Sequence, residues 1–202
     1  RIDKGQRDDG MSGNLRLTVA PINQHGTNLH AGFAFSSKNP ETLPDLAENT
    51  IEIRARTENY IFDPKQLHTG DISDVNYYTR YGYELMGIKG PWYFQAEAFS
   101  TEIKRWYGKP EVNLRGAYAT MAWTVTGETR YYYIDEGEVG PIEKPRKDWG
   151  ALELAARFSY TDLNDLGAGI HGGSSKQLML GVNYYPNTNI KLMFNYSIVD
   201  LD

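Results

Sequence analysis

The chain has 202 residues, of which 40% are hydrophobic and 23% are charged, so it can form one domain with a core and is not a disordered chain. It contains no cysteine, which excludes disulfide frameworks, thiolate metal sites and thiol nucleophiles. The formal net charge of −5 argues against a nucleic-acid binder, which usually carries a basic excess.

In the first half of the chain, alternating apolar and polar residues predict three strands, because side chains on a strand point to opposite faces in turn. We expect strands over residues 14–19 and 29–36, joined by a polar loop, and a short charged strand over residues 51–56. The stretch 58–74 contains Asp63-Pro64 and Gly70 and has little periodicity. It is predicted to be a long loop, and loops of this length are either functional or disordered.

A clear hairpin is predicted next, with strands over residues 75–88 and 92–103 joined across Lys89-Gly90-Pro91. Residues 112–126 form another predicted strand, with Ala117, Met121 and Trp123 on its outward face and Tyr118 on its inward face. A polar connection follows over residues 127–148. It is rich in tyrosine and in charges of both signs.

The last fifty residues contain three runs with nearly perfect alternation, over residues 151–160, 177–184 and 190–198. The turn Pro186-Asn187-Thr188-Asn189 joins the last two runs as a hairpin. The chain then contains about nine strands and no convincing amphipathic helix. The predicted class is all-β and antiparallel, and residues 1–202 form a single domain.

Such strands can turn their apolar face inward, as in a soluble β-sandwich, or outward to lipid, as in a membrane barrel. The strands are often 10–13 residues long, which suits the ~9–11 residues of a membrane-spanning strand better than the ~5–6 residues of a typical globular strand. Aromatic residues gather at their ends, where interfacial girdles lie. Very short turns alternate with long loops, which is typical of outer-membrane barrels. A soluble β-sandwich binding module would also explain the alternation, and it remains the alternative.

The segments GALELAARFSYTDLN (150–164) and LMLGVNYYPNTNIKLMFNY (178–196) resemble the phosphate-selective porin O and P family. Further similar segments are RARTE (54–58), HTGDI (68–72), GPWYFQAE (90–97) and TGETR (126–130). The resemblance covers most of residues 11–198. It implies an antiparallel transmembrane β-barrel meander in the bacterial outer membrane, with about nine strands of a sixteen-stranded barrel that is commonly a homo-trimer.

We expect this chain to correspond to roughly the second half of such a barrel and to be incomplete at both ends. It begins with Arg1 rather than Met, and it stops at Leu201-Asp202, whereas such barrels generally end in an aromatic residue. An open sheet in a bilayer would leave unpaired backbone groups. The chain is therefore expected to be part of a porin.

The resemblance implies passive diffusion of small anions such as phosphate, past cationic side chains that line a water-filled path. Arginine suits this role because its planar fork donates two hydrogen bonds to phosphate oxygens. Lys65 and His68 lie on the loop that the family folds into the lumen. The candidates in inward phase are Arg16, Arg54, Arg56, Arg80, Arg115, Arg157 and Lys191.

Two other interpretations stay open for these arginines and for the whole chain. Glu52, Glu84, Glu97 and Glu153 share the inward faces, so arginine–glutamate pairs can simply brace the barrel wall. A general or structural outer-membrane barrel without anion selectivity would then fit. Catalysis finds little support, because the four histidines are scattered without metal-ligand spacing, and no cofactor or metal is expected.

Overall fold

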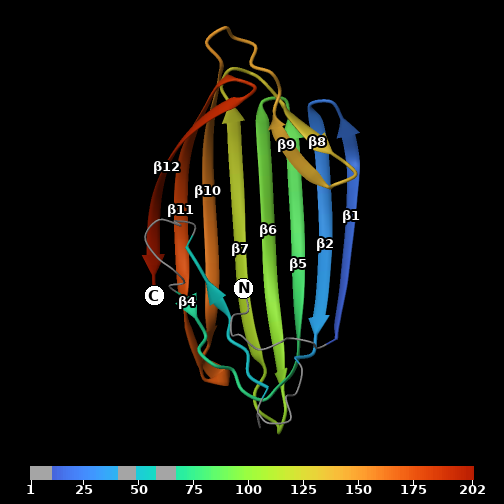
Figure 1. Ribbon diagram of the computed structural model, residues 1–202, viewed down its shortest axis with the longest axis vertical. Helices are drawn as coiled ribbons and strands as arrows, with labels where there is room; N and C mark the ends of the chain where they lie inside the picture. Colours follow the sequence, from blue (N-terminus) through green and yellow to red (C-terminus); the bar gives the residue numbers. More distant parts are fainter. Residues whose placement is uncertain (1–10, 41–48, 58–66) are drawn as a thin grey trace.

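The computed structural model describes residues 11–40, 49–57 and 67–202, which form one large antiparallel sheet and two small ones (Figure 1). The large sheet has eight strands in the order β1-β2-β5-β6-β7-β10-β11-β12. Their bounds are β1 Ser12–Gln24, β2 Thr27–Lys38, β5 Val75–Lys89, β6 Trp92–Arg105, β7 Val112–Thr124, β10 Ala151–Asp165, β11 Ile170–Asn187 and β12 Ile190–Leu201. The predicted all-β, antiparallel class is confirmed.

Neighbouring strands of the large sheet pair in antiparallel fashion. A turn or loop at one end of the molecule connects each strand to the next. The hairpins β1–β2, β5–β6 and β11–β12 turn at the upper end in Figure 1, together with the long loop from β7 to β10. At the β5–β6 turn, Gly90 adopts φ 56°, the left-handed region that glycine enters without a steric cost. The hairpin predicted across Lys89-Gly90-Pro91 is therefore confirmed.

The two long connections contain short strands that the sequence pattern did not place correctly. Residues 51–56 do not form a strand of the large sheet; β3 (Arg54–Ala55) pairs only with β4 (Leu67–His68), inside the connection from β2 to β5. The reason is that Ile51 pairs with Ile72 and both side chains are buried against the sheet instead of joining its ladder. The connection from β7 to β10 contains a second hairpin, β8 (Arg130–Tyr133) and β9 (Glu138–Ile142).

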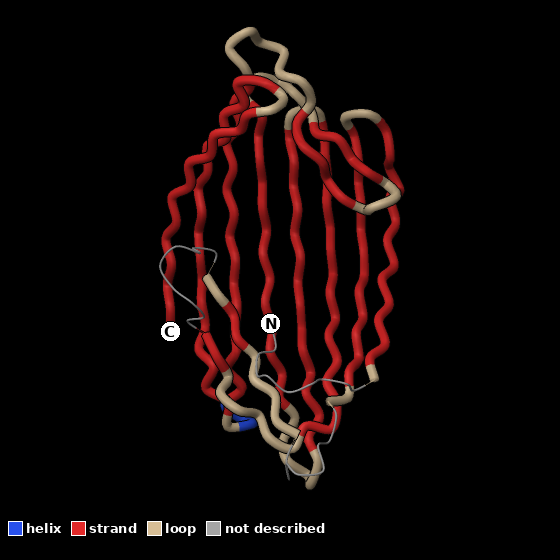
Figure 2. The backbone as a smooth tube through the Cα atoms, viewed as in Figure 1, coloured by secondary structure: helices blue, strands red, loops and turns tan. Residues whose placement is uncertain are grey.

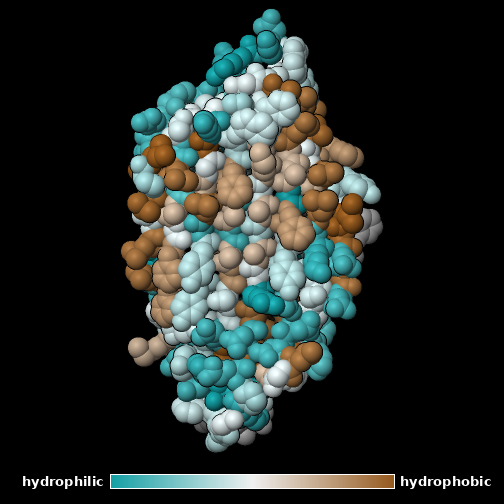
Figure 3. Space-filling model, turned by 180° about the vertical axis from the view of Figure 1, so that it is seen from behind, coloured by the Kyte–Doolittle hydropathy of each residue, from teal (hydrophilic) through white to brown (hydrophobic). Residues whose placement is uncertain are grey.

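One face of the large sheet is apolar and exposed, and we call it the apolar face. Across the strands Leu154 pairs with Trp123 and Val182, and Leu180 pairs with Tyr196, so these side chains share one side. Figure 3 shows apolar side chains and rings across the middle of this face, with polar residues gathered at both ends. Trp92 stacks on Trp123 at the upper border, with ring centroids 5.3 Å apart.

Both long connections fold over the opposite side, which we call the loop-covered face (Figure 2). At the lower end, apolar side chains of the connection pack against the strand ends in a buried core that includes Ile51, Leu67, Ile72, Ile103 and Leu163. At the upper end, Ile142 of β9 packs with Ala151 and Tyr185. Burial of these apolar side chains fixes the two connections on the same face.

The edges of the large sheet are β1 and β12, which have one strand partner each among the described residues. The described part of the chain has a single 3₁₀ turn, Leu166–Ala168, and no helix long and apolar enough to cross a membrane.

Candidate solute path on the loop-covered face

The loop-covered face of the sheet carries rows of polar side chains, because residues in register on neighbouring strands point to the same side. In one such row Glu84 lies between Gly32 and Glu97, and Glu97 is opposite Tyr118. The same alternation that makes one face apolar therefore makes this face polar, and the long loops close over it.

Arg16 and Glu84 form an ion pair across this face. The guanidinium donates from Nη2 to Oε1 at 2.9 Å and to Oε2 at 3.1 Å, and from Nε to Oε1 at 3.1 Å. A Cβ at Gly32 would lie 2.1 Å from Glu84 Oε1, so a larger residue there would push the Glu84 side chain out of its present position. The charge of Arg16 is neutralised by this contact.

His30 connects the sheet to the inward hairpin β8–β9. Its side chain is 1% exposed, its Nδ1 lies 2.7 Å from the Tyr132 hydroxyl, and its Nε2 lies 3.4 Å from Glu84 Oε1. The turn of the hairpin also comes close, since a Cβ at Gly137 would lie 3.2 Å from His30 Cε1. These contacts hold the hairpin against β2 and β5.

Arg130 and Glu153 hold the same hairpin against β10. The Glu153 side chain is 1% exposed and accepts hydrogen bonds from Arg130, from Asn183 at 2.8 Å and from Tyr185 at 3.3 Å. The Arg130 guanidinium also lies over the Tyr93 ring, 5.1 Å from its centroid. A charge this deeply buried requires such partners, because burial of an unpaired carboxylate is costly.

Glu128 organises the base of the same connection. It is fully buried, and it accepts hydrogen bonds from the Thr126 hydroxyl and from the backbone amide of Arg146, the latter at 2.8 Å. Burial alone would raise the pKa of this carboxyl, but its hydrogen bonds to Thr126 and to backbone amides, with the positive charge of Arg146, outweigh burial and hold the pKa below its ordinary value of 4.5. Glu128 therefore acts as an ionised anchor of the loop.

Arg157 and Lys191 lie against aromatic rings of the wall. The Arg157 guanidinium is 3.6 Å from the centroid of the Tyr118 ring and donates to the Thr120 hydroxyl at 3.0 Å. The Lys191 ammonium lies 5.3 Å from the centroid of the Tyr185 ring. Both cations stay on the loop-covered face, where the sequence predicted them.

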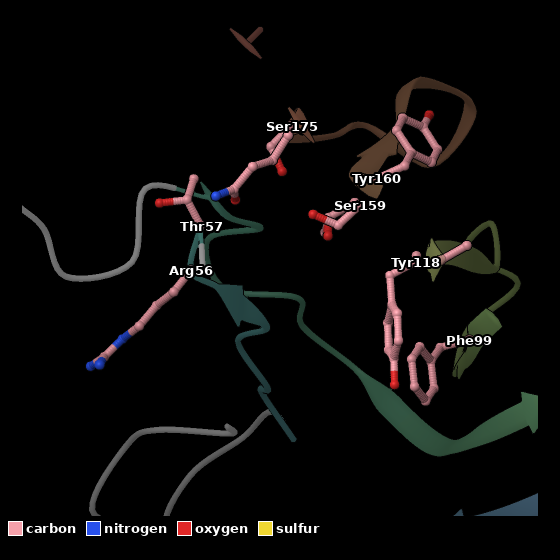
Figure 4. Close-up of a pocket in the computed structure, with 11 residues that line it drawn as sticks. Arg56, Thr57, Phe99, Tyr118, Ser159, Tyr160 and Ser175 are labelled. Atoms are coloured by element: carbon pink, nitrogen blue, oxygen red, sulfur yellow. The ribbon is translucent and has the colours of Figure 1, made fainter. Parts of the chain in front are cut away.

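Arg80 and Arg56 have no carboxylate within ion-pair distance among the described residues. Arg80 is exposed on β5 and lies 5.7 Å from the centroid of the Tyr78 ring. Arg56 is exposed on the lower connection and lines a cavity of about 120 Å³. In Figure 4 its guanidinium extends away from Ser159 and Ser175 of that cavity.

The other predicted site residues lie elsewhere. Arg54 belongs to β3 and donates to Glu52 at 2.6 Å, His68 is exposed on β4, and Lys65 lies outside the described residues. Arg115 is in register with Ser100 and Asp162 and shares the phase of Ala117, so it lies on the apolar face at its lower polar border. The prediction that Arg115 faces inward is therefore wrong, because the odd positions of β7 point away from the loops.

Sequence reasoning missed the residues by which the upper connection contacts the wall, namely Arg130, Tyr132 and His30. The composition of residues 127–148, rich in tyrosine and charge, was the available signal. It did not indicate that this segment folds back onto β2 and β10, because those contacts join residues up to 102 positions apart.

Comparison with known proteins supports the resemblance noted in the sequence. The sequence model of the phosphate-selective porin O and P family matches residues 2–202. An uncharacterised protein of Caulobacter vibrioides is 26% identical over 86% of this chain and 34% of its own length. Porin O of Pseudomonas aeruginosa is 23% identical over 96% of this chain and 49% of its own length.

The chain therefore spans between a third and a half of the length of these two relatives. The resemblance noted in the sequence is confirmed. The expected coverage of residues 11–198 lies within the match, which runs from residue 2 to residue 202, whereas the expectation that this chain corresponds to the family's second half was off.

Proposed function

The chain belongs to the phosphate-selective porin O and P family of Gram-negative outer membranes, and from that membership we propose that it forms part of the wall of a water-filled pore for small anions such as phosphate. Membership of a porin family points to a channel rather than an enzyme. The apolar face would contact lipid, and the loop-covered face would line the path of the solute.

The observation that carries the anion preference is the exposed guanidinium of Arg80 on the loop-covered face. It has no carboxylate partner among the described residues, so its charge is available to a passing anion. Its planar fork can donate two parallel hydrogen bonds to phosphate oxygens. Arg56, on the loop that packs over the same face, would extend the cationic path.

A pore without anion preference is the second candidate, and specific contacts favour it for some arginines. Arg16, Arg54 and Arg130 each pair with a glutamate. These pairs neutralise charge and brace the wall or its loops. We therefore assign the anion path first to Arg80 and Arg56. Arg157 and Lys191 would contribute less, because an aromatic ring of the wall covers part of each cation.

The open edges of the sheet support a barrel that other strands complete. In a bilayer each unpaired backbone group costs several kcal/mol, and β1 and β12 each have one unpaired edge among the described strands. We propose that further strands of the same porin pair with both edges, and that the complete barrels assemble as a homo-trimer in outer-membrane lipid.

Reversal potentials in a salt gradient test this function with the full-length porin in a planar bilayer. We expect preference for the anion, and we expect Arg80→Gln to reduce the permeability ratio of anion to cation. Arg115→Gln is the matched control, because it removes the same charge from the opposite face and should leave the ratio unchanged. A cation-selective wild-type pore would overturn the proposal.

A further inference from the structure

An exposed aromatic ring, Phe99, lies among polar side chains on the loop-covered face. Phe99 of β6 is in register with Gly82 of β5 and Gly116 of β7, so it points to the same side as Glu97 and Tyr118. It is 48% exposed. Contact of this ring with water is unfavourable, and its neighbours Glu97, Tyr118 and Arg80 are polar, although Met193 on β12 is also exposed on this face.

The two glycines leave part of this ring uncovered. With no side chain at 82 or 116, Phe99 has no lateral neighbour in its own row on either adjoining strand. A Cβ at Gly82 would reach 3.8 Å from the ring, so even one methyl group would begin to cover it. The sequence thus places a bare aromatic surface between β5 and β7.

Cavities lie on both sides of Phe99, and the ring lines both of them. One cavity, of about 490 Å³, is also lined by Arg16 and Arg80. The other, of about 120 Å³, is lined by Tyr118, Ser159 and Ser175. Figure 4 shows the rings of Phe99 and Tyr118 beside each other, with the serines on the neighbouring wall.

The two cavities differ in which polar groups face the ring. In the larger cavity Glu84 neutralises Arg16, whereas Arg80 has no carboxylate partner among the described residues and remains available to an anion. Ser159 and Ser175 supply hydroxyl groups to the smaller cavity; Arg56 also lines it, but its guanidinium extends away from these serines (Figure 4). The surface therefore presents a cation, an exposed ring and hydroxyl groups side by side. A phosphate ester with an organic ring could place its phosphate on the cation and its ring on the aromatic side chain.

We propose that this surface, defined by Arg80, Phe99 and Ser159, binds organic phosphate monoesters, with the phosphate on Arg80 and a planar organic group stacked on Phe99. The proposal rests on the proposed pore function and narrows its solute class. Inorganic phosphate would use Arg80 alone. An aryl phosphate would use both residues, because every planar ring has a face that stacks on an aromatic side chain.

Block of the ionic current by phenyl phosphate and by inorganic phosphate tests the proposal with the full-length porin in a planar bilayer. We expect phenyl phosphate to block wild type at a lower concentration than inorganic phosphate. Phe99→Leu should raise the half-blocking concentration of phenyl phosphate about fivefold to tenfold and change that of inorganic phosphate less than about twofold. Phe99→Tyr keeps a ring and should keep the wild-type difference.

Phe158→Leu is the matched control, because Phe158 is 50% exposed but lies on the apolar face in register with Leu178 and Ala119. It should leave block by both solutes unchanged. Arg80→Gln should weaken block by both solutes, because each places its phosphate there.

Three results would overturn the proposal: equal block by both solutes in wild type, no effect of Phe99→Leu, or equal loss of both solutes in Phe99→Leu. The reversal potential of the wild-type pore separates this failure from failure of the proposed function. An anion-selective pore that does not distinguish the two solutes refutes only the aromatic site. A cation-selective pore refutes both.

Discussion

Arginine at position 180 is expected to destabilise the protein strongly, because Leu180 lies near the middle of the apolar face. It is 49% exposed and is in register with Ala156 on β10 and with Tyr196 on β12. Ala156 is the central residue of the apolar run from Leu152 to Tyr160. Leu180 should therefore contact the hydrocarbon centre of the bilayer.

The magnitude follows from the height of that apolar run. From Leu152 to Tyr160 the strand rises about 26 Å at ~3.3 Å per residue, or about 20 Å along the membrane normal when it is tilted by ~40°. This is close to the ~25 Å lipid-facing band of outer-membrane barrels. A cation at its midpoint costs about 2–4 kcal/mol, falling to about 0–1 kcal/mol near the interfaces.

Reversible unfolding by denaturant in lipid vesicles measures this cost for the full-length porin. The free energy of unfolding of Leu180→Arg should fall by about 2–4 kcal/mol relative to wild type. Asn195→Arg is the control, because Asn195 is exposed on the loop-covered face opposite Gly181 and the new cation would meet water. Equal and near-neutral effects of the two substitutions would refute the assignment of the apolar face to lipid.

Two further predictions concern the upper connection. Glu153→Ala leaves the largely buried Arg130 without its carboxylate and should lower the free energy of unfolding by about 3 kcal/mol. The double variant with Arg130→Met should recover part of this loss, and additive effects of the two substitutions would contradict the pairing. Because the pKa of Glu128 is lowered by folding, its stabilising contribution is present above pH 4.5 and is lost as the pH falls through its lower folded pKa. Hydrogen exchange of the Arg146 backbone amide measures this, because that amide donates to the Glu128 carboxylate. An amide that already loses its protection against exchange above pH 4.5 would contradict the prediction.

The strands of the large sheet could be predicted from the sequence because each strand shows its own alternation of apolar and polar residues. Leu152, Leu154 and Phe158 alternate with Glu153 and Arg157 without help from any other part of the chain. A period of two defines two faces, and short turns such as the one at Gly90 bring neighbouring strands together as antiparallel pairs. This local information is sufficient for the class, the hairpins and most of the lining.

The expected inward position of Arg115 conflicts with the alternation of its own strand. Arg115 has the odd phase of Ala117 and Met121, which the sequence pattern places on the outward face. Register with Ser100 on β6 and Asp162 on β10 confirms that outward side. Alternation thus gives the phase within one strand, and pairing across strands fixes which side of the sheet each phase occupies.

An antiparallel sheet with one apolar and one polar face is predictable from the amino-acid pattern alone, because that property is periodic and local. What covers the polar face, and which cations there are neutralised, depends on the three-dimensional packing of the chain. The contacts of His30 with Tyr132 and of Glu153 with Arg130 join distant segments. No periodic pattern encodes them, since they depend on where the long connections are packed by buried apolar side chains such as Ile72 and Ile142.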